Sequence, residues 1–126
     1  MQVLERPEVR SAQGAALSKA VLRAADKLKV SQAALSLILG LSEATVSRMK
    51  KGDYSLQAGS KPFELGVLFV RLFRSLDAIV GGDEAAASAW LANPNLALGA
   101  TPAEKIRSVP GLMNVIDYLD ARKAII

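Results

Sequence analysis

The densest group of hydrogen-bonding and cationic side chains in this sequence lies in the run TVSRMKK. Hydroxyl and guanidinium groups hydrogen-bond to base edges in the major groove of DNA, and lysine ammonium groups neutralise backbone phosphates. The chemistry of this run is therefore the non-covalent recognition of a polyanion. We predict that Thr45, Ser47 and Arg48 contact bases. The same pattern predicts that Lys50 and Lys51 contact phosphates.

A second group of unusual composition closes the sequence, where two cations and two isoleucines follow the last predicted helical anchor: Arg122, Lys123, Ile125 and Ile126. A chain terminus usually frays and is polar. The isoleucines are therefore either docked back onto this chain or held out for a partner. Residue type alone favours neither alternative over the other.

Groups suited to covalent catalysis are sparse. The chain has no cysteine and no histidine, which removes thiol and imidazole catalysis and the zinc sites that these residues build. The remaining Ser, Lys, Asp and Glu residues form no catalytic motif. The run LGATP, residues 98–102, is too short for a phosphate-binding loop and lacks the lysine that follows its glycine. We expect no enzymatic activity, no cofactor and no metal site.

The distribution of charge predicts two parts in the 126-residue chain. Residues 1–61 carry ten Lys or Arg against five Asp or Glu, a net charge of +5, whereas residues 62–126 carry six against seven, a net charge of −1. Glycine, serine and proline interrupt the helical pattern between residues 52 and 62. We therefore predict a DNA-binding part at 1–61, beginning with a loose tail over residues 1–14, and a second helical part at 62–126.

The predicted location is the cytoplasm. The first residues lack the apolar run of a secretory signal, and the absence of cysteine fits a reducing compartment. The stretch from Phe63 to Val80 is apolar on nearly every side, but it contains Arg71, Arg74 and Asp77. Each such charge costs about 2.5 to 3.5 kcal/mol at the centre of a bilayer. We expect a central packed helix, with no membrane contact.

The elements that must position these residues are helices, since apolar residues recur at helical spacing and the predicted fold class is all-α. A supporting helix is expected over residues 16–30. Two short helices follow within residues 31–52: Ser31 caps the first, Gly40 provides the turn, and Ser42 caps the second. This arrangement resembles the helix-turn-helix of Xre and Cro-type repressors, in Gln32, Leu35, Gly40, Leu41, Ser42, Val46 and Ser47. The resemblance implies operator DNA as a partner and a homodimer that reads two half-sites.

Residues 90–106, WLANPNLALGATPAEKI, predict two helix boundaries placed back to back. Asp83 is expected to cap the preceding helix, and Thr101 and Glu104 are expected to form a capping box for the following one. Trp90 and Leu91 would anchor the outgoing helix. Apolar packing of the elbow is assigned to three further residues: Leu96, Leu98 and Ile106.

The second half resembles the toxin-binding domain of Xre, MbcA and ParS antitoxins, the partners of RES-domain toxins. The resemblance runs from about Gly66 to Leu119 and includes the WL, PN, LG and TP pairs between residues 90 and 102. Further matching positions are Gly82, Ala86, Gly111 and Val115, and two departures are Ala100, where a second glycine is common, and Pro110.

This second resemblance implies an antitoxin that silences an NAD-degrading RES-domain toxin and represses its own operon. In that family the carboxy-terminal segment lies at the mouth of the toxin's NAD pocket, which assigns toxin contact to Arg122, Lys123, Ile125 and Ile126. The alternative is a DNA-binding transcriptional regulator whose second half only dimerises or senses a small molecule.

Overall fold

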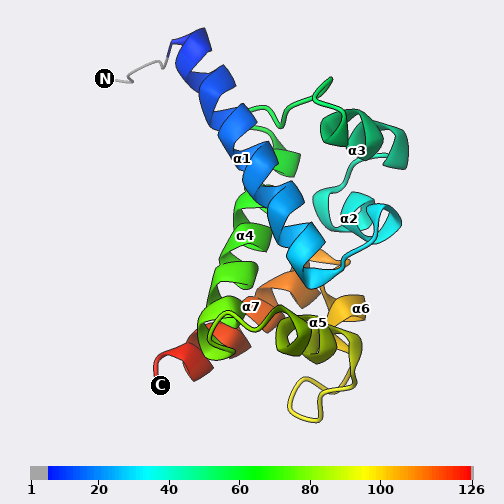
Figure 1. The fold of residues 1–126 in the computed structure, drawn as a ribbon, viewed down its shortest axis with the longest axis vertical. Coiled ribbons are helices and arrows are strands. Elements are labelled where there is room, and N and C mark those ends of the chain that lie inside the picture. Colours follow the sequence, from blue (N-terminus) through cyan, green and yellow to red (C-terminus); the bar gives the residue numbers. More distant parts are fainter. Residues whose placement is uncertain (1–5, 126) are drawn as a thin grey trace.

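The computed structural model describes residues 6–125 and confirms the all-α class (Figure 1). Within this range the chain forms seven helices and no β-strand. In chain order they are α1 (Pro7–Leu28), α2 (Gln32–Leu39), α3 (Glu43–Lys50), α4 (Lys61–Ile79), α5 (Glu84–Ala92), α6 (Pro102–Lys105) and α7 (Val109–Lys123).

Helix α1 begins at Pro7, so the prediction of a loose tail through residue 14 is wrong from residue 7 onward. The loop that follows α3 packs on this first half of α1. The amide of Leu56 donates a buried hydrogen bond of 2.8 Å to Ser18 Oγ, and a Cβ at Gly14 would lie 1.9 Å from the Leu56 carbonyl oxygen. Glycine is therefore required at this crossing. The contact is long-range, and for that reason the local sequence pattern does not reveal it.

The two short helices form as predicted. Ser31 Oγ accepts a hydrogen bond of 3.1 Å from the amide of Ala34, and Ser42 Oγ accepts one of 3.1 Å from the amide of Thr45. Gly40 ends α2 in the left-handed conformation, with φ of 69°. Each cap satisfies an amide that the helix cannot pair internally.

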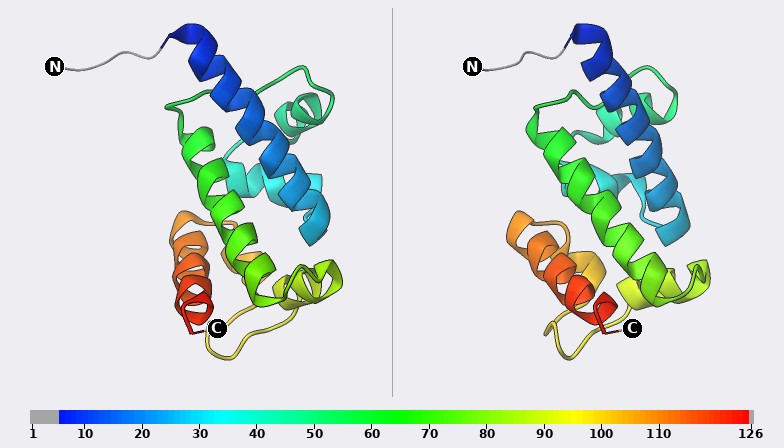
Figure 2. Two further views of the ribbon diagram at one scale, coloured as in Figure 1. Left: turned by 60° about the vertical axis from the view of Figure 1, so that its left-hand side comes forward. Right: turned by 90° about the vertical axis from the view of Figure 1, so that its left-hand side faces the viewer.

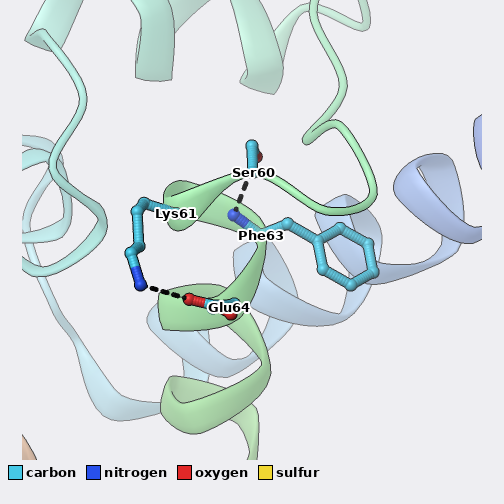
Figure 3. Close-up of polar contacts among 4 residues, drawn as sticks. All are labelled: Ser60, Lys61, Phe63 and Glu64. Atoms are coloured by element: carbon cyan, nitrogen blue, oxygen red, sulfur yellow. Dashed lines mark hydrogen bonds and ion pairs between the residues drawn. The ribbon is translucent and has the colours of Figure 1, made fainter.

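Helix α4 is the central element of the fold, as its apolar sequence predicts. It contacts α1, α2, α5 and α7, and Figure 2 shows it between α1 and α7. Its start is fixed locally: Ser60 Oγ accepts from the Phe63 amide at 3.3 Å, and Lys61 pairs with Glu64 at 3.0 Å (Figure 3). No helix in the described range is long and apolar enough to cross a membrane. The division of the chain at residue 61 stays a prediction.

One continuous hydrophobic core joins the two predicted parts. Its buried side chains come from α1 to α5, from α7 and from the segments between them. Fully buried members of α4 link the two ends of this core: Phe69, Leu72 and Leu76. Because α4 contributes to both ends, α2 and α3 share one packed core with the C-terminal helices.

The elbow between α5 and α6 differs from the prediction in two respects. Thr101 makes no side-chain cap in α6, a single turn in which the amides of Glu104 and Lys105 donate to the Thr101 carbonyl oxygen. A Thr101→Ala change therefore loses no capping bond. Leu96 was expected in the packing of the elbow, but it is 102 % exposed. The predicted cap of α5 is present, with 3.0 Å between the Ala86 amide and Asp83 Oδ1.

Candidate functional sites

The exposed side of α3 carries a chain of polar contacts. Arg48 Nη2 donates to Thr45 Oγ1 at 3.0 Å, and Thr45 Oγ1 lies 2.9 Å from Ser42 Oγ. Arg48 is exposed, and Thr45 and Ser47 are half-buried. Thr45 therefore orients the Arg48 guanidinium along the first turns of the helix, where a base-reading side chain has to be held.

The angle between α2 and α3 is set by packing beneath this polar chain. Val46 and Met49 are buried under α3, and Gln32 Nε2 donates to the Glu43 carbonyl oxygen at 3.3 Å, joining the starts of the two helices. Lys50 and Lys51 remain exposed, and neither belongs to an ion pair among the described residues. Two free cations at the end of a rigid helix pair are suited to phosphate contacts.

At the other end of the molecule, a polar cluster ties α7 to α4. Ser75 Oγ donates to Asp120 Oδ1 at 2.7 Å, and Arg71 Nη2 pairs with Asp120 Oδ2. Ser75 is fully buried and the side chain of Asp120 is 26 % exposed. The hydrogen bond from Ser75 lowers the pKa of the Asp120 carboxyl, assisted by the hydrogen bond and charge of Arg71 and by the charge of Lys123, against the opposing effect of burial. Sequence reasoning missed this cluster, whose partners lie 45 and 49 residues apart.

We expect Asp120→Asn to lower the free energy of unfolding by about 1 to 2 kcal/mol at neutral pH, through loss of the charged hydrogen-bond acceptor. Because the pKa of Asp120 is lower in the folded chain than its ordinary 3.8, its carboxylate stabilises the fold above that value. This stabilisation is lost as the pH falls through the folded-state pKa. Urea unfolding should therefore show a gap between wild type and variant that is constant above about pH 5 and closes as the pH falls below about 4. A gap that stays constant with pH would contradict the assigned role.

The C-terminal end of α7 follows directly on this cluster. Arg122 and Lys123 are exposed, and Ile125 is 82 % exposed, so Ile125 does not dock onto this chain. Ile126 lies outside the described residues. The Arg122 guanidinium lies 5.6 Å from the centre of the Tyr118 ring, which helps to orient it beside the last turn of the helix.

An aromatic stack holds α7 to α5. The ring centroids of Trp90 and Tyr118 lie 6.1 Å apart, with 17° between the ring planes. Both rings are partly buried and pack against the core. The only tryptophan of the chain thus links two helices, as predicted. Its partner, Tyr118, is the same ring that the Arg122 guanidinium contacts.

A groove of about 570 Å³ runs between α1 and α4. Its apolar lining includes Leu17, Val67 and Val70, and Val67 is 46 % exposed. Three cations also line it: Arg71, Arg74 and Lys123. The groove therefore combines apolar side chains with a cationic rim along α4.

Two family models match the chain. Residues 7–71 match the antitoxin Xre-like helix-turn-helix domain, and residues 75–124 match the antitoxin Xre/MbcA/ParS C-terminal toxin-binding domain. No curated protein matches the chain. The first match covers α1 to α3 and the first part of α4, and the second covers the last five residues of α4 with α5, α6 and α7. The chain belongs to the Xre/MbcA/ParS antitoxin family, with a helix-turn-helix that implies DNA binding and a C-terminal domain that implies a toxin partner.

Proposed function

We propose that this protein is the antitoxin of a RES-domain toxin that degrades NAD, and that it represses its own operon through α2 and α3. The observation that carries the proposal is the matched toxin-binding region, residues 75–124, joined through the continuous helix α4 to a matched helix-turn-helix. Family membership also favours a non-enzymatic regulator. Because its proposed partners are operator DNA and a toxin that degrades cellular NAD, we propose that the protein acts in the cytoplasm.

The proposed inhibitory contact is the C-terminal segment of the chain. Its isoleucine side chains would bury apolar area in the mouth of the toxin's NAD pocket, while Arg122 and Lys123 pair with acidic groups at the rim. The exposure of Ile125 leaves it accessible for this contact. The Asp120 cluster and the stack under Tyr118 hold the helix from which the segment extends.

Co-expression tests the proposal as a whole. The RES-domain toxin encoded next to this gene should arrest growth and deplete cellular NAD when expressed alone, and this protein should restore both. The helix-turn-helix mutant Arg48→Ala is the matched control, because it should still rescue growth when both genes are driven from an unrelated promoter. Failure of rescue by well-expressed protein, or a neighbouring gene that encodes no RES-domain protein, would favour the transcriptional regulator instead.

Operator binding tests the second role. Arg48→Ala should weaken binding to the specific operator by about 1 to 3 kcal/mol, the usual value of a base contact. Lys51→Ala should instead lower affinity for all DNA sequences and reduce the slope of log affinity against log salt by about one unit. Titrations with operator and scrambled duplexes at several salt concentrations separate the two effects. Unchanged operator binding by both variants would remove α3 as the recognition helix.

The proposed homodimer uses the groove between α1 and α4. A repressor of this shape reads two half-sites about one helical turn apart, which requires two copies. The partly exposed Val67 and the apolar lining beside it offer a surface for the second copy. Val67→Glu should shift the protein to monomers and weaken operator binding. Sedimentation that shows no dimer of the unmodified chain at operator-binding concentrations would contradict this interface.

A further inference from the structure

The loop between α5 and α6 displays an apolar side chain to solvent. Leu96 is 102 % exposed and Ile125 is 82 % exposed, whereas the other exposed large hydrophobic residues of the described range lie between 43 % and 55 %. The loop between α5 and α6, which contains Leu96, and the C-terminal end of α7 lie at the same end of the molecule, away from α2 and α3 (Figures 1 and 2). Leu96 also lies inside the matched toxin-binding region.

The backbone of this loop is closed on itself. The Asn95 amide donates to the Ala100 carbonyl oxygen at 3.1 Å, and the Gly99 amide donates back to the Asn95 carbonyl oxygen at 2.9 Å. The Asn95 side chain adds a third bond, accepting from the Leu98 amide at 3.1 Å. Gly99 adopts φ of 71°, which glycine tolerates without strain. A side chain presented by such a preorganised loop loses little conformational entropy when a partner binds it.

The loop and the C-terminal segment share one support. Trp90 lies in the last turn of α5, a few residues before the loop, and Tyr118 lies in α7, a few residues before the C-terminal segment. The stacking of these two rings therefore joins the two helices from which the loop and the C-terminal segment extend. Contacts from both the loop and the C-terminal segment would define the orientation of a bound protein. A contact from the C-terminal segment alone would not.

We propose that Leu96 is a second anchor for the toxin, inserted into an apolar pocket on the toxin surface outside its NAD pocket. This inference rests on the proposed function, and it divides the work between two contacts: the C-terminal segment blocks the NAD pocket, and Leu96 contributes affinity and orientation. We do not assign the operator to this contact, because the loop between α5 and α6 lies at the end of the molecule away from α3 (Figures 1 and 2). An apolar residue at the tip of a rigid loop fits a hydrophobic pocket on a protein surface.

The test is Leu96→Ser in the full-length chain, with binding and inhibition measured separately against the RES-domain toxin encoded next to this gene. Because the loop is closed by backbone atoms and Asn95, the variant should keep the wild-type melting temperature. Its dissociation constant should rise about 10- to 100-fold, the loss expected when a leucine is no longer buried. Saturating variant should still inhibit NAD consumption completely, since its C-terminal segment is intact.

The matched control is Leu37→Ser, which removes a leucine that is 55 % exposed on α2 and should leave toxin affinity unchanged. Equal affinity of Leu96→Ser and wild type would overturn the second anchor while leaving the antitoxin proposal standing. A loss of self-association with unchanged toxin affinity would overturn it as well, and would assign Leu96 to a contact between two copies of this chain. If the wild-type chain forms no complex with the toxin, the proposed function fails, and this inference fails with it.

Discussion

Replacing Trp90 with alanine is expected to lower the free energy of unfolding by about 3 kcal/mol, the low end of the range for emptying a large aromatic site. The ring is partly buried, packs against the core and stacks on Tyr118 at 6.1 Å. Loss of the stack alone accounts for about 0.5 to 1.5 kcal/mol of the effect. Urea unfolding followed by circular dichroism is the suitable measurement, because the variant retains no tryptophan for fluorescence.

Two further variants make this result interpretable. Trp90→Phe keeps an aromatic ring opposite Tyr118 and should recover more than half of the lost stability. Val109→Ala removes a side chain that is 54 % exposed and should change stability by less than about 0.5 kcal/mol. Toxin affinity of Trp90→Ala should fall with its folded fraction and somewhat further, because the loop and the C-terminal segment lose their shared support. Unchanged stability with abolished toxin binding would show that Trp90 is itself a contact residue.

Local rules for helix caps and turns were sufficient to predict the two short helices of the helix-turn-helix. Ser31 and Ser42 cap helices because a hydroxyl at the cap position reaches an amide three residues on, and Gly40 turns because it tolerates positive φ. Both rules act within one turn of chain. The many apolar residues of α4 likewise predicted its central position, although its exposed side carries Glu64, Arg71 and Arg74.

The remaining features depend on contacts distant in sequence or on closed loops. Nothing near Pro7 reveals that α1 is supported by the loop at Leu56, or that Asp120 receives a hydrogen bond from Ser75. Leu96 was misplaced because residue type predicts burial, whereas the backbone hydrogen bonds of its loop leave the side chain outside. The base contacts of Arg48 and the toxin contacts of the C-terminal segment stay predictions, since both require the partner.

Deletion of residues 122–126 is expected to release the toxin's activity while leaving the fold and operator binding intact. The deletion begins after Tyr118, Leu119 and Asp120, so the aromatic stack, the core contact and the polar cluster of α7 all remain. It removes the exposed isoleucine that the proposal places at the mouth of the NAD pocket and the two exposed cations that it places at the rim. If Leu96 is a second anchor, the truncated chain should still bind the toxin. The bound toxin should then consume NAD at close to its free rate.

The most direct test of this account is the rate of NAD consumption by the toxin, measured with full-length and truncated chains at concentrations where complex formation is confirmed separately by gel filtration. A variant with serine at both Arg122 and Lys123 distinguishes loss of charge from loss of the whole segment. The account predicts complete inhibition by the full-length chain and near-free toxin activity in the truncated complex. Equal inhibition by the two chains would show that the C-terminal segment is dispensable, and would move the inhibitory contact to the surface between residues 95 and 105.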